Sequence, residues 1–259
     1  MNVLDRFRLD GKRAFITGGS RGFGRVIALA LAEAGADVAL AARDADSLAR
    51  TAGEIEERGR KAWTYAANVA DPAACEALCE RALKELGPID ILVNNVGGRQ
   101  QDVPVEATSL ETWQGFVDLN LTHVFLCTRT IGGAMLARGA GRVINIGSIS
   151  GMIANRGIAG RHYETTKAAV IHFTRATAAD WAPRGVTVNV ICPGLFMTEP
   201  NVTWAKNHPE VIKTFVSAVP MGRAGEPDEI GPLAVYLASP ASSYVTGATF
   251  VIDGGYTLW

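Results

Sequence analysis

Short runs of consecutive apolar residues alternate along the chain with longer segments in which apolar residues recur at helical spacing. Strands are predicted for the apolar runs at residues 12–17, 37–41, 61–66, 89–93, 141–148, 186–192 and 248–252. Short strands that are apolar throughout are typical of a parallel sheet buried on both faces by helices. The pattern therefore predicts an α/β fold, a doubly wound parallel sheet in a single domain over residues 1–259.

Helix signals fill the segments between these runs. Asp71 and Pro72 begin one helix as N-cap and first helical residue, and residues 110–137 predict a long helix with Asn120 and His123 inside an apolar stretch. A mid-helix Asn is more often a surface residue or a satisfied core group than a functional one. Residues 199–220 contain short helical pieces beyond a strand end, so a segment of about 195–220 suits a substrate lid, with a plain surface loop as the alternative.

Chemically distinctive residues stand where several predicted strands end. These residues are Gly18, Arg43, Asn68, Asn95 and Ser148. Parallel strands direct their carboxyl ends to the same edge of a sheet, where doubly wound folds bind ligands. The sequence therefore predicts that these residues line one cleft.

A glycine-rich turn follows the first predicted strand. It reads Thr17-Gly18-Gly19-Ser20-Arg21-Gly22-Phe23-Gly24 and leads into an apolar helix. Glycines permit a tight turn and close backbone approach, and a helix N-terminus offers free N–H groups to an anion. This strand–turn–helix context favours a dinucleotide phosphate site over a merely structural turn.

The end of the second predicted strand indicates which dinucleotide is bound. An acidic residue there accepts hydrogen bonds from a ribose 2′-hydroxyl, whereas an arginine favours a 2′-phosphate. Position 43 is Arg, and Arg21 is available from the glycine turn. Asp44 is the alternative ribose ligand, but it more plausibly caps the next helix. These residues favour NADP over NAD.

Composition excludes several classes of protein. Hydrophobic residues make up 48% and charged residues 20% of the 259 residues, and the formal net charge is −1. The chain is therefore expected to be globular and cytoplasmic, with no nucleic-acid or membrane partner. Cys75 and Cys79 share a predicted helix face, but with Cys127 and Cys192 they form no metal-ligand pattern. Reduced, partly buried thiols and no metal are expected.

Tyr163 and Lys167 lie one helical turn apart, shortly after Ser148. A phenol has an ordinary pKa of about 10, too high for a general base near neutral pH, and a neighbouring ammonium lowers it. Lowering that pKa by about 2–3 would take roughly 3–4 kcal/mol of differential interaction. Ser148 could then hydrogen-bond the oxygen whose proton Tyr163 exchanges. A solvated helix face is the alternative reading of this pair alone.

Taken together, the motifs closely resemble the short-chain dehydrogenase/reductase family over essentially the whole chain. The matching segments are the 17–24 turn, Asn94-Asn95-Val96-Gly97, Asn120, Ser148, Tyr163-x-x-x-Lys167, Pro193-Gly194 and Asp253-Gly254-Gly255. Asn68 departs from the usual Asp and Val96 from the usual Ala. The interval between Ser148 and Tyr163 is also longer than in many relatives, which makes Ser150 a rival to Ser148.

The resemblance implies a Rossmann-type sheet of about seven strands and hydride transfer at the nicotinamide C4. Tyr163 would be the general acid/base, Ser148 would polarise the substrate oxygen, Lys167 would bind the nicotinamide ribose and lower the Tyr163 pKa, and Asn120 would hold a relay water. The cofactor residues implied are Gly18, Ser20, Arg21, Gly22, Phe23, Gly24, Arg43, Asn68, Val69, Asn95, Gly97, Tyr163, Lys167, Pro193, Gly194 and Thr198. Many relatives are homotetramers.

The long loop before Tyr163 is similar to loops of family members acting on sugars and polyols, such as gluconate 5-dehydrogenase-like enzymes. Its polar residues, with Arg99 and Gln100, could bind hydroxyls or a carboxylate, or simply face water; they are Asn155, Arg156, Arg161 and His162. The expected activity is NADP-dependent interconversion of a secondary alcohol and a ketone of a small-molecule substrate, such as a sugar, polyol or sugar acid. A 3-oxoacyl-thioester reductase and a non-catalytic nucleotide sensor are the alternatives.

Overall fold

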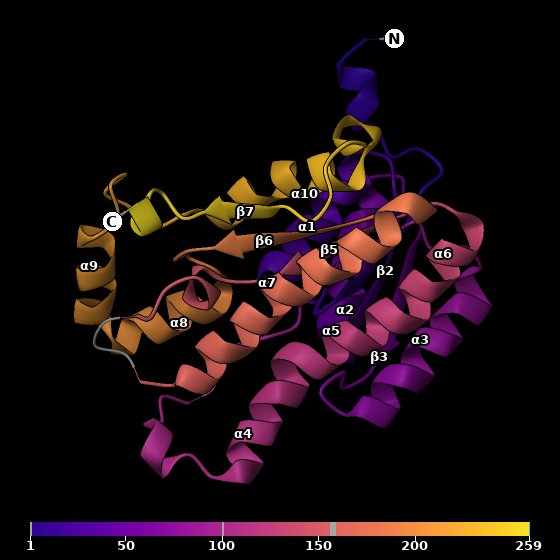
Figure 1. The fold of residues 1–259 in the computed structure, drawn as a ribbon. Helices are drawn as coiled ribbons and strands as arrows, with labels where there is room; N and C mark the ends of the chain where they lie inside the picture. Colours follow the sequence, from indigo (N-terminus) through magenta and orange to yellow (C-terminus); the bar gives the residue numbers. More distant parts are fainter. Residues whose placement is uncertain (1, 100, 156–158, 259) are drawn as a thin grey trace.

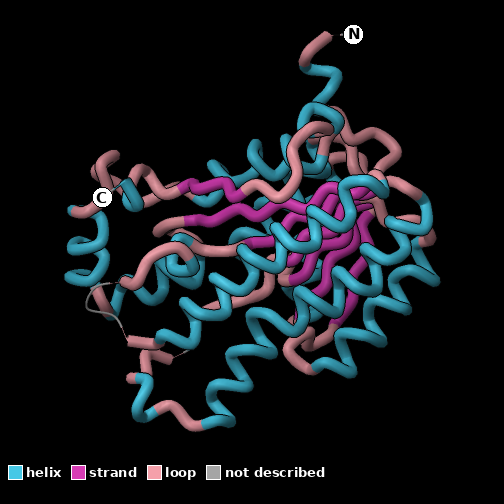
Figure 2. The backbone as a smooth tube through the Cα atoms, viewed as in Figure 1, coloured by secondary structure: helices cyan, strands magenta, loops and turns pink. Residues whose placement is uncertain are grey.

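A parallel seven-stranded sheet forms the centre of the molecule. The computed structural model describes residues 2–99, 101–155 and 159–258. The strands follow the order β3-β2-β1-β4-β5-β6-β7 and form one continuous twisted layer (Figure 2). They are β1 (Arg13–Thr17), β2 (Asp37–Ala42), β3 (Ala62–Ala66), β4 (Ile91–Asn94), β5 (Gly141–Ile146), β6 (Val186–Pro193) and β7 (Thr249–Ile252). The predicted doubly wound parallel sheet is confirmed.

Helices cover both faces of this sheet (Figure 1). One face carries α1 (Gly22–Glu33), α2 (Ala45–Glu57) and α10 (Gly231–Ala238), and its core includes Ile16, Ile27 and Leu40. The other carries α3 (Pro72–Leu86), the helical segments α4 to α6, and α7 (Arg161–Trp181), and its core includes Phe15, Leu92 and Val188. The strands read as unbroken apolar runs because each of the two faces is buried.

The long helix predicted over 110–137 is continuous but not uniform. It consists of α4 (Leu110–Val117), α5 (His123–Cys127) and α6 (Gly133–Arg138), joined by wider π-helical turns at Asp118–Thr122 and Thr128–Gly132. Such turns recur near functional sites because they re-aim the side chains that follow. Asn120 lies in the first of them and is fully buried.

Two predicted N-caps are present. Asp44 Oδ1 accepts a hydrogen bond from Ser47 N at 2.7 Å and caps α2. Asp71 Oδ1 accepts from Ala73 N at 3.0 Å and caps α3, with Pro72 as its first residue. Asp44 therefore serves as the cap of α2. Arg43, the other charged residue after β2, has no capping role.

The segment beyond β6 leaves the sheet before returning. It contains α8 (Glu199–Asn207) and α9 (Pro209–Ser217), neither of which buries a residue fully. Both lie near the carboxyl end of β6 (Figure 1), and their loose packing sets them apart from the helices on the sheet faces. Among the described residues, no helix is both long and apolar enough to cross a membrane.

Candidate active site and nucleotide cleft

The glycine turn takes the shape that an anion site requires. Gly18 and Gly22 have φ values of +70° and +55°, a backbone conformation that residues with a side chain rarely adopt. A Cβ on Gly24 would lie 2.1 Å from the Gly18 carbonyl oxygen, so only glycine fits at position 24. No side chain caps α1, whose N-cap is Arg21, so the first-turn N–H groups are free to bind phosphate.

Asn95 fixes this turn to the neighbouring strand end. Its backbone N–H donates to Thr17 Oγ1 at 3.0 Å. Its side-chain amide donates to the carbonyl of Thr17 at 3.0 Å and to that of Gly18 at 3.3 Å. The predicted cofactor role of Asn95 therefore includes holding the glycine turn against the end of β4.

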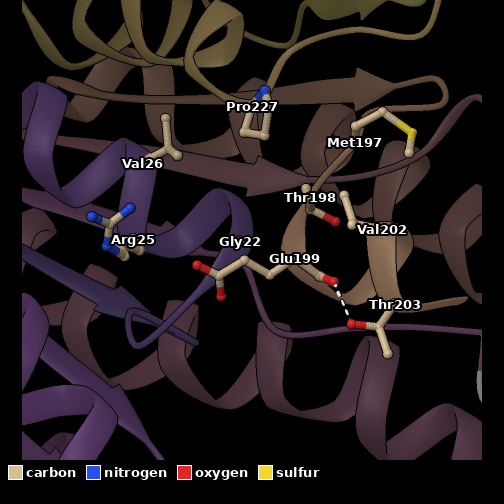
Figure 3. A pocket seen from close by; sticks show the side chains of 9 residues that line it. All are labelled: Gly22, Arg25, Val26, Met197, Thr198, Glu199, Val202, Thr203 and Pro227. Atoms are coloured by element: carbon tan, nitrogen blue, oxygen red, sulfur yellow. Dashed lines mark hydrogen bonds between the residues drawn. The ribbon is translucent and has the colours of Figure 1, made fainter. Parts of the chain in front are cut away.

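A pocket of about 350 Å³ opens between the start of α1 and α8. Figure 3 shows Gly22, Arg25 and Val26 on one side, and Thr198, Glu199 and Thr203 on the other. Thr198 is buried, and its Cβ lies 3.9 Å from where a Cβ of Gly22 would stand. Two residues expected from the sequence to bind the cofactor thus meet here, and the free N–H groups with this pocket fit the phosphates of a dinucleotide.

The residues expected around the adenosine lie at the same sheet edge. Arg21 and Arg43 are both exposed, one at the N-cap of α1 and one directly after β2. Asn68 is exposed after β3, and Val69 beside it is buried. The side-chain oxygen of Asn68 accepts only a local bond from Ala70 N at 3.3 Å, so its amide nitrogen remains available.

Three expected catalytic groups converge on the loop after β4. A Cβ on Gly97 would lie 2.8 Å from both Asn120 Oδ1 and Lys167 Nζ. Lys167 is buried, and its Nζ donates to the Ile146 carbonyl at 2.8 Å and lies 5.9 Å from the centroid of the Tyr163 ring. Gly97 therefore permits the close approach that brings these side chains together.

Asn120 is held firmly within this cluster. Its Oδ1 accepts from Gly98 N at 2.9 Å, and its Nδ2 donates to the Phe116 carbonyl at 3.1 Å. The second bond reaches back along its own helix, next to the π-helical turn. Asn120 thus links the loop after β4 to the long helix, in addition to any bond it makes to water.

Ser148 is better placed than Ser150 to act with Tyr163. The Ser150 hydroxyl accepts from Asn155 Nδ2 at 3.0 Å and so belongs to the loop. The Ser148 hydroxyl lies close enough to Tyr163 to influence the pKa of the phenol. This geometry agrees with the choice of Ser148 made from the sequence.

The pKa shifts of Tyr163 and Lys167 differ from those expected from the sequence. Burial raises the pKa of the Tyr163 phenol above its ordinary value, and the Ser148 hydroxyl and Arg99 guanidinium only partly oppose that shift. Burial lowers the pKa of Lys167 to about 8. The predicted lowering of the phenol's pKa is therefore absent in the chain without nucleotide, because desolvation outweighs the groups that favour the phenolate.

Arg99 contributes a contact that the sequence did not reveal. Its guanidinium carbon lies 4.9 Å from the centroid of the Tyr163 ring, closer than the Lys167 ammonium. The guanidinium is held by the Ala159 carbonyl at 2.7 Å and by Asp102 at 3.2 Å. The sequence placed Arg99 in the cleft, but it did not reveal the contact with Ala159, which lies 60 residues further along the chain.

The long loop before α7 is organised by one buried carboxylate. Glu164 accepts hydrogen bonds from Asn155 Nδ2 at 2.9 Å and from Arg161 Nη1 at 2.7 Å. His162 is buried against the Phe116 ring, with centroids 3.8 Å apart, and its Nε2 lies 3.1 Å from the Gln101 carbonyl oxygen. Asn155, Arg161 and His162 are therefore all bonded to other groups of the protein, although Arg161 stays partly exposed. Gln100 and Arg156 lie outside the described residues.

Three of the cysteines meet in the fold. Cys75, Cys79 and Cys127 are buried together, with their sulfur atoms within 4.8 Å of one another. The packing of α5 on α3 brings Cys127 beside the other two, a contact that their spacing in the sequence does not reveal. His123 is also fully buried, and burial lowers the pKa of its imidazole to about 4.

Known proteins resemble this chain along its whole length. The family model described as enoyl-(acyl carrier protein) reductase matches residues 18–257. Galactitol 2-dehydrogenase (L-tagatose-forming) of Cereibacter sphaeroides is 43% identical over 259 residues, which cover 100% of both chains.

Solved structures agree in fold and sequence. A short-chain type dehydrogenase/reductase of Mycobacterium marinum has a TM-score of 0.92 and 42% identity, covering 99% of each chain. A gluconate 5-dehydrogenase of Burkholderia cenocepacia, in complex with NADP and tartrate, has a TM-score of 0.91 and 38% identity, covering 100% of each chain.

The buried Lys167 ammonium should make stability depend on pH. Its pKa is about 8 in the folded chain and 10.5 ordinarily, so between these values the unfolded chain binds the additional proton. The free energy of unfolding therefore rises with pH in this range, by up to about 3 kcal/mol from this group. Urea unfolding of the wild type and of Lys167→Met should show their difference growing by that amount in favour of the wild type. The same comparison with Lys84→Met, an exposed lysine on α3, should show no such trend; a constant difference for Lys167→Met would contradict the burial of its ammonium.

Proposed function

Because this chain belongs to the short-chain dehydrogenase/reductase family, we propose that it interconverts a secondary alcohol and a ketone of a sugar, polyol or sugar acid with NADP as cofactor. The observation that carries the proposal is the convergence of Ser148, Tyr163, Lys167 and Asn120 at the carboxyl edge of the sheet. The glycine turn that fits dinucleotide phosphates lies at that same edge. A small-molecule carbonyl or alcohol is the substrate that such a site accepts.

NADP supplies or accepts the hydride, and in its oxidised form brings a positive charge to the site. Tyr163 donates the proton to the substrate oxygen during reduction, for which its raised pKa keeps the phenol protonated at neutral pH. Ser148 holds that oxygen by a hydrogen bond. In the oxidative direction Tyr163 acts as base, and the Ser148 hydroxyl and Arg99 guanidinium favour its phenolate.

Lys167 and Asn120 support Tyr163. The Lys167 ammonium, held by the Ile146 carbonyl, would bind the nicotinamide ribose and pass protons toward Tyr163. Asn120, fixed beside it, would hold the relay water. Burial makes Lys167 a readier proton donor, since its pKa of about 8 is near the working range.

NADP is favoured over NAD by the residues after β2 and in the glycine turn. Arg43 and Arg21 are exposed, and Asp44 is engaged as a helix cap rather than as a ribose ligand. Guanidinium groups bind phosphate oxygens through charge-assisted hydrogen bonds. The remaining cofactor contacts are assigned to Gly18, Ser20, Gly22, Phe23, Gly24, Asn68, Val69, Asn95, Gly97, Tyr163, Lys167, Pro193, Gly194 and Thr198.

The substrate class rests on relatives and on Arg99. The chain resembles a galactitol 2-dehydrogenase and a gluconate 5-dehydrogenase, and Arg99 places a cation over Tyr163 where a hydroxyl or carboxylate would lie. A 3-oxoacyl-thioester reductase is the second candidate, favoured by the acyl-carrier description of the matching family model. A nucleotide sensor would not need the complete Ser–Tyr–Lys set.

The chain is proposed to act as one domain over residues 1–259, with about 195–220 as a substrate lid, in a cytoplasmic homotetramer. The loosely packed α8 and α9 support the lid. Apolar side chains left exposed on α4, α5 and β7 support the assembly, since burying them against another subunit would be favourable. They are Leu110, Trp113, Phe125 and Val251.

A substrate panel tests the proposed class. Purified protein with NADPH should reduce keto-sugars or keto-sugar acids, such as L-tagatose and 5-ketogluconate, with kcat/KM at least about tenfold above that for acetoacetyl thioesters. Absorbance of NADPH at steady state is the measurement. A clear preference for the thioester would instead identify the protein as a 3-oxoacyl-thioester reductase.

Tyr163→Phe tests the proton donor. Removing the hydroxyl should lower kcat by about 10²–10⁴-fold with little effect on NADPH affinity, since a positioned acid or base contributes a factor of this size. Nucleotide fluorescence titration reports binding separately from turnover. Tyr244→Phe, which alters a fully exposed tyrosine, should match the wild type. An undiminished rate for Tyr163→Phe would exclude this mechanism.

Arg43→Ala tests the cofactor assignment. Loss of a charge-assisted phosphate contact should lower kcat/KM for NADPH by roughly 10- to 100-fold and leave the value for NADH nearly unchanged. Lys84→Ala, an exposed change on α3, should affect neither. A wild type that prefers NADH, or equal losses with both cofactors, would refute the role of Arg43.

A further inference from the structure

Three buried thiols meet between two helices on the face of the sheet opposite α1. Cys75 and Cys79 lie one turn apart on α3, and Cys127 lies on α5, which packs beside α3 (Figure 1). The Cys127 sulfur is 3.6 Å from that of Cys75 and 3.6 Å from that of Cys79. All three side chains are fully buried.

These separations suit a metal ion better than a disulfide. In a tetrahedral zinc site with Zn–S bonds of about 2.3 Å, neighbouring sulfur atoms stand roughly 3.8 Å apart. A disulfide needs the two sulfurs at about 2.05 Å and would leave the third thiol unused. The two sulfur–sulfur distances of 3.6 Å are thus close to those between ligands that share one ion.

A fourth donor lies on the same helix as Cys127. His123 is one turn before Cys127 on α5 and is fully buried. Neither of its ring nitrogens has a hydrogen-bond partner among the described residues; the carbonyls of Asp118 and Leu119 lie nearby but outside bonding geometry. A buried, unsatisfied imidazole is unfavourable, and metal coordination would satisfy one of its nitrogens.

We propose that Cys75, Cys79, Cys127 and His123 form a buried structural site for a thiophilic divalent cation, with Zn²⁺ as the natural occupant. Two i, i+4 pairs on adjacent helices present four donors to one interhelical space. The His123 nitrogens lie outside the 4.8 Å group of sulfurs, so coordination by His123 requires its ring to turn toward them. Thiols lose their protons to solvent on binding, and no group is oxidised.

Zn²⁺ with three thiolates and a neutral imidazole carries one net negative charge. Cys75 and burial raise the pKa of the Cys79 thiol, and the Arg129 guanidinium, which is paired with Glu76, partly opposes that rise. The ion would also fasten α3 to the start of α5, directly after the turn that carries Asn120.

Cobalt binding tests the site, because Co²⁺ in a tetrahedral thiolate site gives intense sulfur-to-metal absorption that surface histidines cannot produce. Reduced wild-type protein is exposed to Co²⁺ both folded and during refolding, because all four donors are buried. One cobalt per chain with this absorption, displaced by Zn²⁺ and accompanied by a rise in Tm, is expected. The protein should also retain zinc when purified from zinc-supplemented cells.

Matched variants separate this site from other cysteines. Cys127→Val, which keeps a similar buried volume, should weaken cobalt binding at least about 100-fold, and His123→Leu about 10- to 100-fold. Cys192→Val removes the remaining buried cysteine, on β6, and should keep the full cobalt spectrum.

Two results would overturn the proposal without any variant. One is the absence of thiolate absorption in wild type treated both ways. The other is fewer than four free thiols in denatured protein that holds no metal, which would assign Cys127 to a disulfide. Equal binding by wild type and a folded Cys127→Val, checked by circular dichroism, would also overturn it.

Discussion

The Lys167 ammonium, buried where α7 meets β5, is the constraint around which the candidate active site is built. Desolvation lowers its pKa to about 8, and the ammonium donates a hydrogen bond to the Ile146 carbonyl. A charge so enclosed must have a fixed hydrogen-bond partner, since an unpaired one would shift out of its charged form. The carbonyl belongs to the last residue of β5, so the position of Lys167 is tied to the sheet. Gly97, which has no side chain, lets the ammonium and Asn120 approach the same loop.

The shape of the predicted nucleotide cleft depends on a second constraint, the close approach of two backbone segments within the glycine turn. Gly24 packs against the carbonyl of Gly18, and Asn95 ties that turn to the end of β4. The glycine turn and the catalytic loop therefore extend from neighbouring strands, β1 and β4, whose register is set by the parallel sheet. The predicted phosphate site and the candidate catalytic site keep a fixed separation because both follow strands of the same hydrogen-bonded sheet.

The long helix connects the catalytic cluster to the cysteine cluster. Its first π-helical turn carries Asn120, which bonds Gly98, and the segment that follows carries Cys127, whose sulfur lies against the cysteines of α3. A wider turn changes which side chains share a face, so one helix serves two groups of neighbours. On the proposal made here, a metal between α3 and α5 would steady the element that positions Asn120.

Local signals in the sequence determined the strands, the glycine turn, the caps at Asp44 and Asp71, and the pairing of Tyr163 with Lys167, because each depends on residues within a few positions of one another. Their meeting at one sheet edge also followed, since parallel strands share a direction.

Only the tertiary structure decided which groups are buried and which distant side chains meet. It buries the Tyr163 phenol and so raises its pKa, it lets Glu164 accept hydrogen bonds from Asn155 and Arg161, and it sets the Arg99 guanidinium over the Tyr163 ring. The contact between Cys127 and Cys75, which are 52 residues apart in the sequence, likewise depends on how the helices pack. Burial and contact between distant helices come from how whole elements pack, and apolar periodicity shows that a helix has a buried face without showing which side chains it will meet there.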